Sequence, residues 1–125
     1  MILGVGVDLV SIGRVAALIE RHGERALGRL FRPAEIRYCR SRSRPMESFA
    51  ARFAAKEAFF KALRTGWGQG GEWTEVEVVT EESGAPALRL LGTAAARANE
   101  QGVQRLHLSL THTEEMAGAY VVLEG

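Results

Sequence analysis

Apolar and polar residues change their spacing several times along the chain, and each change marks a predicted element. Segment 2–9 is rich in β-branched residues and predicts a strand. Helix-forming residues with suitable end residues follow, and we expect helices between Ser11 and Gly23, from Pro33 to about Cys39 and from Pro45 to about Arg64. The remaining pattern predicts strands over 73–80, 87–91, 105–111 and 116–123, with a short helix from Thr93 to Gln101.

The order of these elements is β-α-α-α-β-β-α-β-β. This order predicts an α+β fold in which helices pack on a small, largely antiparallel sheet. A chain of 125 residues fits a single domain, so we expect one domain over residues 1–125. So few strands leave sheet edges that another subunit often covers.

The first predicted strand carries one acidic residue in otherwise nonpolar company. Gly4, Gly6 and Asp8 share a face because successive side chains of a strand alternate. Two glycines allow a ligand or another backbone to come close, and a carboxylate beside them suits a metal ion. Asp8 is equally suited to cap the helix that begins near Ser11, and its position alone does not separate the two interpretations.

Two nucleotide-binding motifs are excluded. The glycines at positions 4 and 6 would need glycine or alanine at position 9 to complete a dinucleotide fingerprint, and the chain has Leu9 there. No Walker A pattern is present either.

The helix predicted from Pro45 is apolar over most of its circumference and should be largely buried. At about 100° per residue, the phenylalanines lie on one side and four alanines on the other. Yet Arg52, Lys56, Glu57, Lys61 and Arg64 are on it. Buried charges must pair or bind an ion, whereas a helical pair from Glu57 to Lys61 contributes only about 0.2–0.5 kcal/mol. We therefore favour a binding site on this helix over a simple helical ion pair.

A histidine stands at the end of the strand predicted over 105–111. His112 continues the face of Leu106, Leu108 and Leu110, which we expect to point inward. A lone histidine at a strand end is more often structural than catalytic, so geometry must decide its role.

Composition indicates an ordinary globular chain and a reducing compartment. Hydrophobic residues make up 46% of the chain, and no apolar run approaches the roughly 20 residues that span a bilayer. The only cysteine, Cys39, excludes an internal disulfide and a multi-cysteine zinc site. We expect a cytoplasmic protein.

The net charge of +1 hides a strong asymmetry. Residues 1–64 contain 13 basic and 6 acidic residues, whereas residues 65–125 contain 3 and 9. This split favours an acidic partner or a polyphosphate ligand for the first half. The alternative is two solvated surfaces of opposite sign, which could pair between subunits.

Three segments together resemble one known family, the holo-acyl-carrier-protein synthases, which are 4'-phosphopantetheinyl transferases. Residues 6–14 resemble its G-x-D-x-x-x-x-x-R opening, and residues 56–63 match its K-E-A-x-x-K-A-L signature. Residues 109–112 resemble its S-x-S-H strand, with Thr111 where serine is usual. The resemblance spans the chain, and the second motif is the specific one. Ala85 replaces the lysine of a frequent G-K-P.

The resemblance implies transfer of 4'-phosphopantetheine from coenzyme A to a serine of apo acyl carrier protein, with release of 3',5'-ADP, for fatty acid biosynthesis. Family members bind Mg²⁺ through the carboxylates that match Asp8 and Glu57. Two acidic residues without a His/Cys cluster fit such an ion, which prefers few carboxylates plus water and phosphate. The residues expected to bind coenzyme A are Lys61, Arg52, Lys56, Arg44 and His112. The general base is left open.

The resemblance also implies a protein partner and an assembly. Acyl carrier proteins are strongly acidic, and Arg14, Arg21 and Arg25 can share one helical face if the first helix runs past Gly23. A solvated helix face is the alternative. The family forms trimers with sites shared between subunits, so we expect a homotrimer, without a nucleic-acid or membrane partner.

Two other classes of protein compete with this interpretation. Nine arginines between positions 14 and 44 favour a nucleic-acid-binding module, but aromatic residues are sparse there and the second half is acidic. A non-catalytic interaction domain would leave Asp8, Glu57 and Lys61 unexplained.

Overall fold

The computed structural model describes residues 1–66 and 68–125, so Trp67 lies outside the described part. Its elements are β1 (Ile2–Ser11), α1 (Ile12–Leu30), α2 (Pro33–Ser41), α3 (Pro45–Leu63), the 3-10 helix η1 (Trp73–Glu75), β2 (Val76–Thr80), β3 (Pro86–Leu90), α4 (Gly92–Glu100), β4 (Arg105–His112) and β5 (Met116–Glu124). The predicted order and the α+β class are confirmed. None of the helices described is long and apolar enough to cross a membrane.

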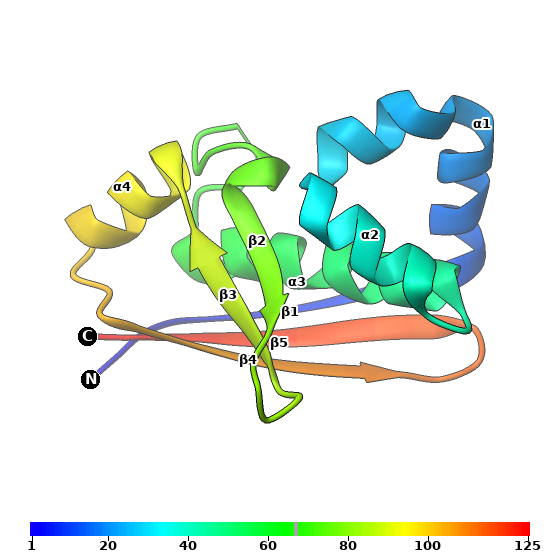
Figure 1. Ribbon diagram of the computed structural model, residues 1–125. Helices are drawn as coiled ribbons and strands as arrows, with labels where there is room; N and C mark the ends of the chain where they lie inside the picture. The colour runs from blue at the N-terminus through cyan, green and yellow to red at the C-terminus, as the bar shows by residue number, and fades with distance from the viewer. Residues whose placement is uncertain (67) are drawn as a thin grey trace.

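The strands form two antiparallel sheets rather than one. A three-stranded sheet has the order β1-β5-β4, and β2 and β3 form a separate hairpin. Figure 1 shows α3 lying along the three-stranded sheet, with α1 and α2 grouped over one end of it and α4 near the other. Asp8 pairs with Ala119 of the central strand, and His112 pairs with Ala117 from the opposite side.

The central helix α3 is buried on most sides, as its sequence predicts. The aromatic rings of Phe59 and Phe60 pack with the inward side chains of β5, while Phe49 packs toward α1 and α2. The helix begins at Pro45, where the missing N–H costs nothing, and ends at Arg64 in the left-handed region with φ 65°.

Helix α1 runs further than the sequence predicts. Gly23 adopts φ 56° and ψ −137°, which bends the chain, but the helix resumes and ends only at Leu30. Ala26, Leu27 and Leu30 are buried after the bend, so packing restores the helix that glycine interrupts. Gly23 therefore interrupts the helix as predicted, but the sequence did not predict the second helical segment that follows it up to Leu30.

Two shorter boundaries also differ from prediction. The first three residues of segment 73–80 form η1, and the strand begins at Val76. Helix α4 has Leu91 rather than Thr93 as its N-cap. A distant side chain replaces the local cap, because Glu75 Oε2 accepts a hydrogen bond of 2.8 Å from the Thr93 N–H.

The approach of β1 to α3 depends on two glycines. A Cβ on Gly6 would lie 1.9 Å from the carbonyl oxygen of Ala58, and one on Gly4 would lie 2.1 Å from that of Ala62. Both clashes are with backbone atoms, which cannot rotate away. The glycines therefore set the distance between β1 and α3.

Replacing Gly6 by alanine should lower the free energy of unfolding by about 1–3 kcal/mol, because the added methyl forces strand and helix apart. Urea unfolding at a fixed protein concentration measures this. Gly28→Ala is the control, since its Cβ would meet nothing within 4 Å and alanine favours a helix. Equal midpoints for the two variants would contradict the close contact.

Candidate functional site

The structure brings three of the predicted site residues together at the β1 side of α3. Lys61 Nζ donates to Asp8 Oδ1 at 2.8 Å and to the Val7 carbonyl oxygen at 3.1 Å. Asp8 is mostly buried and Lys61 is more than half exposed, so the group opens to solvent on the lysine side. We call Asp8, Glu57 and Lys61 the carboxylate site.

The environment of Glu57 in this group disfavours its charged form. Partial burial raises the pKa of its carboxyl, and the negative charge of Asp8 raises it further. A hydrogen bond from the Trp73 side chain and the charge of Lys61 act in the opposite direction. Two carboxylates that repel each other at a half-open position form a donor set that a divalent cation would neutralise.

The backbone contacts of β1 place these side chains. Gly4 and Gly6 rest against the helix at Ala62 and Ala58, so their strand neighbour Asp8 continues along the same face of β1 toward α3. Glu57 and Lys61 precede those alanines by one residue each and lie one helical turn apart. The ion pair that Lys61 forms is with Asp8 of β1 rather than with Glu57 of its own helix.

A second group gathers where β4 ends and α3 begins. Glu47 Oε2 lies 3.4 Å from His112 Nδ1 and 3.7 Å from an Arg44 nitrogen. Arg44 and His112 are both more than half exposed, whereas Glu47 is largely covered. No sequence pattern singled out Glu47, and only the fold brings it to His112.

Arg52 has an unusual environment for a charged side chain. It is 5% exposed, and its guanidinium carbon lies 4.0 Å from the centre of the Tyr38 ring. Within the described residues its Nε has no hydrogen-bond partner. A buried guanidinium with spare donors can accept an anion such as a phosphate. We call Arg44, Arg52 and His112 the cation site.

Lys56 is placed differently from the expectation that it binds a phosphate. Its side chain is fully buried, and Nζ donates to Glu35 Oε1 at 2.7 Å and to the Trp73 carbonyl oxygen at 3.0 Å. Glu35 is itself 1% exposed. No open surface leads to this ammonium group in the described structure, so we assign Lys56 to an internal ion pair instead of the phosphate-binding set.

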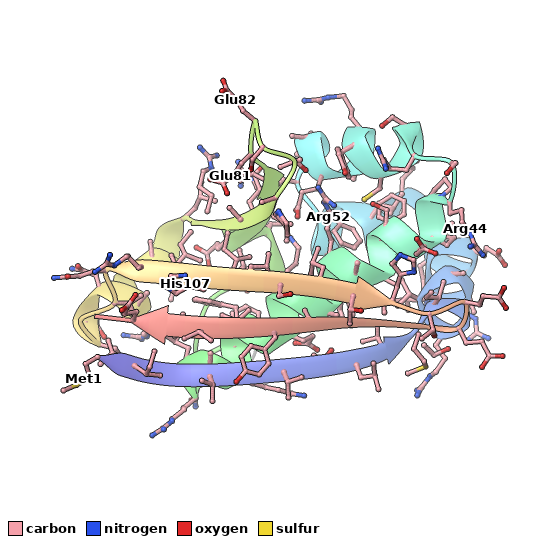
Figure 2. The ribbon with its side chains drawn as sticks, turned by 90° about the horizontal axis from the view of Figure 1, so that it is seen from below. Met1, Arg44, Arg52, Glu81, Glu82 and His107 are labelled. Carbon is pink, nitrogen blue, oxygen red and sulfur yellow. The ribbon has the colours of Figure 1, made fainter. Side chains whose placement is uncertain are left out.

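The carboxylate site and the cation site lie at opposite edges of the three-stranded sheet. Asp8 is on the edge strand β1 and His112 on the opposite edge strand β4, which two strand spacings place about 10 Å apart. Figure 2 shows Arg44 and Arg52 on the β4 side, away from β1. The buried helix α3 fills the space between the two sites.

The three arginines expected to contact a carrier protein are exposed on α1. Arg14 and Arg21 line one hollow of about 240 Å³, and Arg25 lines a neighbouring cavity of about 540 Å³. Leu18 and His22 line both, so the three arginines border one continuous surface. That surface exists because α1 continues past Gly23.

Trp73 is a further residue that the sequence did not single out. Its ring lies 6.2 Å from that of Phe53, it lines the larger cavity beside Leu18 and Leu30, and it hydrogen bonds to Glu57. Its position at the start of a predicted strand carried no signal of these contacts.

Comparisons with known proteins agree along the whole chain. Residues 4–121 match the model of the 4'-phosphopantetheinyl transferase superfamily. The holo-[acyl-carrier-protein] synthase of Koribacter versatilis is 51% identical over 124 residues, which cover 99% of both chains. That of Solibacter usitatus is 44% identical with the same coverage.

Solved structures show the same similarity. The holo-[acyl-carrier-protein] synthase of Neisseria meningitidis has a TM-score of 0.92 and 33% identity, with 100% of both chains covered. That of Helicobacter pylori, solved in complex with coenzyme A, has a TM-score of 0.85 and 30% identity over 96% of this chain and 99% of its own. A superfamily match, relatives at this identity and a shared fold lead to one conclusion. The chain is an enzyme of the holo-[acyl-carrier-protein] synthase family, within the 4'-phosphopantetheinyl transferase superfamily.

Proposed function

We propose that this enzyme transfers 4'-phosphopantetheine from coenzyme A to a serine of apo acyl carrier protein, with Mg²⁺ at the carboxylate site, in support of fatty acid biosynthesis. The observation that carries the proposal is the convergence of Asp8, Glu57 and Lys61 at an open edge of the fold. The serine oxygen forms a bond to the phosphorus next to pantetheine, and the bond from that phosphorus to 3',5'-ADP breaks. The serine proton passes to a base that we leave unassigned.

Asp8 and Glu57 would hold the metal. Partial burial and, after it, the charge of Asp8 raise the pKa of the Glu57 carboxyl, which fits a site built for added positive charge. The ion, when bound, supplies charge stabilisation for the pyrophosphate and the leaving group. Lys61 uses two of its three donors on Asp8 and Val7, and its exposed ammonium leaves the third for a phosphate oxygen.

The cation site would bind the remaining phosphate of coenzyme A. Arg52 offers a buried, rigid guanidinium on the face of Tyr38, and Arg44 and His112 lie at the open end of the same side. Such groups would position coenzyme A. In phosphoryl transfer, positioning of the substrate together with electrostatic stabilisation provides most of the catalysis.

We further propose that a homotrimer completes each site from two copies. The outward face of β1 and β5 carries four exposed apolar residues, each with between 47% and 64% of its surface accessible to solvent: Val5, Val7, Leu9 and Tyr120. Contiguous apolar patches of this kind mark protein contacts. Because α3 separates the two sites within one chain, a donor that reaches both would draw carboxylates from one copy and cations from the next.

Val7→Glu should dissociate the assembly, because each interface would bury an unpaired carboxylate. We expect a shift to monomer in light scattering after size-exclusion chromatography, with loss of transfer activity. Thr80→Glu, a change at an exposed position on β2, is the control and should leave the oligomer intact. A Val7→Glu protein that keeps the wild-type mass would show that this face is not an interface.

The carrier would dock on α1, where Arg14, Arg21 and Arg25 border one surface. An acidic protein meeting three exposed arginines should associate quickly, and the rate should fall with salt.

Mass spectrometry of the carrier tests the proposed reaction. Apo acyl carrier protein incubated with the enzyme, coenzyme A and Mg²⁺ should gain about 340 Da, and EDTA should prevent the gain. No gain with a folded carrier would reject the reaction for that carrier. A gain that survives EDTA would keep the reaction and reject the metal.

A further inference from the structure

We propose that the buried pair of Lys56 and Glu35 is a positioning device for the carboxylate site and acts through Trp73. The pair touches neither substrate nor metal; it fixes the segment that carries the tryptophan against Glu57. This inference rests on the proposed function, because it takes Glu57 as a residue that the transfer reaction requires.

The backbone of Trp73 is attached to α3 through Lys56. Lys56 Nζ donates to both Glu35 Oε1 and the Trp73 carbonyl oxygen, at 2.7 and 3.0 Å. Both ionised side chains are almost completely excluded from solvent. In such surroundings the hydrogen bonds are short and resist exchange with water, so the Trp73 carbonyl is held firmly to α3.

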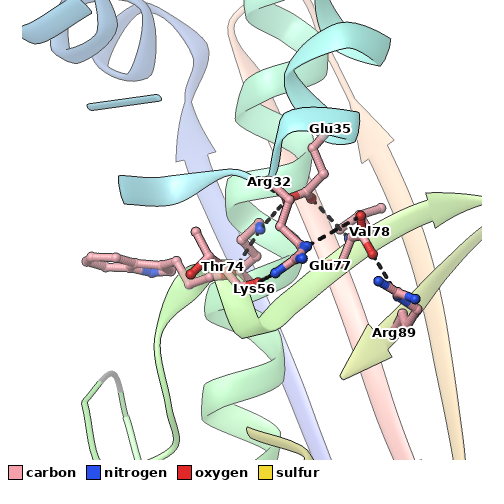
Figure 3. A network of polar contacts seen from close by, with 8 residues as sticks. Arg32, Glu35, Lys56, Thr74, Glu77, Val78 and Arg89 are labelled. Carbon is pink, nitrogen blue, oxygen red and sulfur yellow. Dashed lines mark hydrogen bonds and ion pairs between the residues drawn. The ribbon is translucent and has the colours of Figure 1, made fainter. Parts of the chain in front are cut away.

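Glu35 and Arg32 hold the same segment, residues 73–78, at further points. Glu35 Oε2 accepts from the Val78 N–H at 3.0 Å, and Oε1 also accepts from the Arg32 N–H at 2.9 Å. Arg32 in turn donates to the Thr74 carbonyl oxygen at 3.3 Å. Figure 3 shows how these contacts join α2, α3 and the start of β2. Residues 73–78 are therefore fastened at both ends.

Residues 73–78 follow a glycine-rich loop, so the contacts that hold them affect where Trp73 lies. Gly66, Gly68 and Gly71 all have positive φ, between 69° and 115°, and belong to the loop that leads into η1. A glycine-rich loop loses much conformational freedom on folding and gives its neighbour little direction. The contacts of Lys56 and Glu35 therefore give Trp73 an attachment to α2 and α3 in addition to its chain connection to the loop.

Trp73 reaches the carboxylate site through the face of α3 that carries Phe53 and Glu57. Phe53 and Glu57 lie four residues apart on α3, so their side chains share one face of that helix. The Trp73 ring packs on Phe53, which brings the indole N–H near enough to Glu57 to lower the pKa of that carboxyl. A displacement of Trp73 would take the indole N–H away from the Glu57 carboxylate.

Stability alone is a poor explanation for the pair. Removal of two charges from water costs several kcal/mol per ion, and well-packed apolar residues at such positions are often as stable or more stable. The combination Glu35→Leu with Lys56→Met therefore separates the two roles. It preserves volume and leaves no unpaired charge, but it cannot hold the Trp73 carbonyl.

The experiment uses full-length chains that carry Trp67→Phe, so that all tryptophan emission comes from Trp73. We expect the Glu35→Leu/Lys56→Met variant to remain folded, to shift its emission to longer wavelength, and to respond less to added Mn²⁺ alone. In the transfer assay kcat should fall about 10- to 100-fold, with KM for coenzyme A changed by less than about threefold. Glu124→Gln, at an acid of β5 that pairs with Arg105 and His107 and with none of the residues that fasten Trp73, is the control and should match the Trp67→Phe parent.

A second variant keeps the proposal testable if the double variant fails to fold. Trp73→Phe retains the ring contact and the backbone carbonyl but lacks the indole N–H, and should show the same selective loss of kcat. Wild-type kcat in Trp73→Phe, or unchanged emission and kcat in a folded double variant, would overturn the positioning role. If the parent itself transfers nothing, the proposed function fails, whereas the emission and Mn²⁺ measurements still decide whether the pair positions Trp73.

Discussion

The Glu57→Gln enzyme should transfer phosphopantetheine at least about 10³-fold more slowly than wild type, a loss of about 4 kcal/mol of transition-state stabilisation. Glutamine has nearly the same shape, so the fold and the Trp73 contact are preserved. The substitution removes one of the two negative charges that would hold the metal. Steady-state rates of carrier modification across a range of Mg²⁺ concentrations measure the effect.

The acid limb of the wild-type profile should reflect the same carboxylate. The pKa of Glu57 is raised by burial and by Asp8, so protonation begins at a higher pH than for an ordinary glutamate. Falling pH should therefore raise the Mg²⁺ concentration needed for half-maximal rate. Glu81→Gln, an exposed acid at the hairpin turn, serves as the control for charge removal. A Glu57→Gln enzyme with near-normal rates would exclude Glu57 from the metal site.

Glu35→Ala should be the most destabilising single substitution considered, with a loss of about 3–5 kcal/mol in the free energy of unfolding. It leaves the Lys56 ammonium buried without its counter-charge and removes the acceptor for the Val78 and Arg32 N–H groups. Burial already lowers the pKa of Lys56, because water no longer stabilises its charged form. Urea unfolding at one fixed protein concentration is the measurement, since the proposed oligomer would gain stability with concentration.

The double replacement Glu35→Leu/Lys56→Met provides the comparison. It should be clearly more stable than Glu35→Ala, because neither charge is then left alone, although the Val78 and Arg32 N–H groups still lose their acceptor. A Glu35→Ala protein within about 1 kcal/mol of wild type would contradict the buried pair, since unpaired buried charges always carry a large cost.

The two lysines of α3 show how far the sequence could predict the site. Lys56 and Lys61 stand in one motif, and both were expected at phosphates. Their partners distinguish them: Lys56 is buried against Glu35, 21 positions earlier, whereas Lys61 pairs with Asp8, 53 positions earlier, and stays exposed. Helical periodicity alone could not show which of the two lysines faces the core.

In the fold, too, features that depend on nearby residues could be predicted, and features that depend on distant contacts could not. The period of apolar residues in α3 and the alternating leucines of β4 depend on neighbours within a few positions, and both predictions are confirmed. The continuation of α1 beyond Gly23 and the capping of α4 by Glu75 depend on distant packing. No local pattern contains that information.

The separation of the carboxylate and cation sites by α3 has a genetic consequence. If each active centre joins two copies, two inactive proteins can restore each other. In mixed trimers of Glu57→Gln and Arg52→Ala chains, some centres would combine the intact carboxylates of the Arg52→Ala chain with the intact cations of the Glu57→Gln chain. Co-expression of two null alleles would then rescue growth by intragenic complementation, which chains with self-contained active centres cannot show.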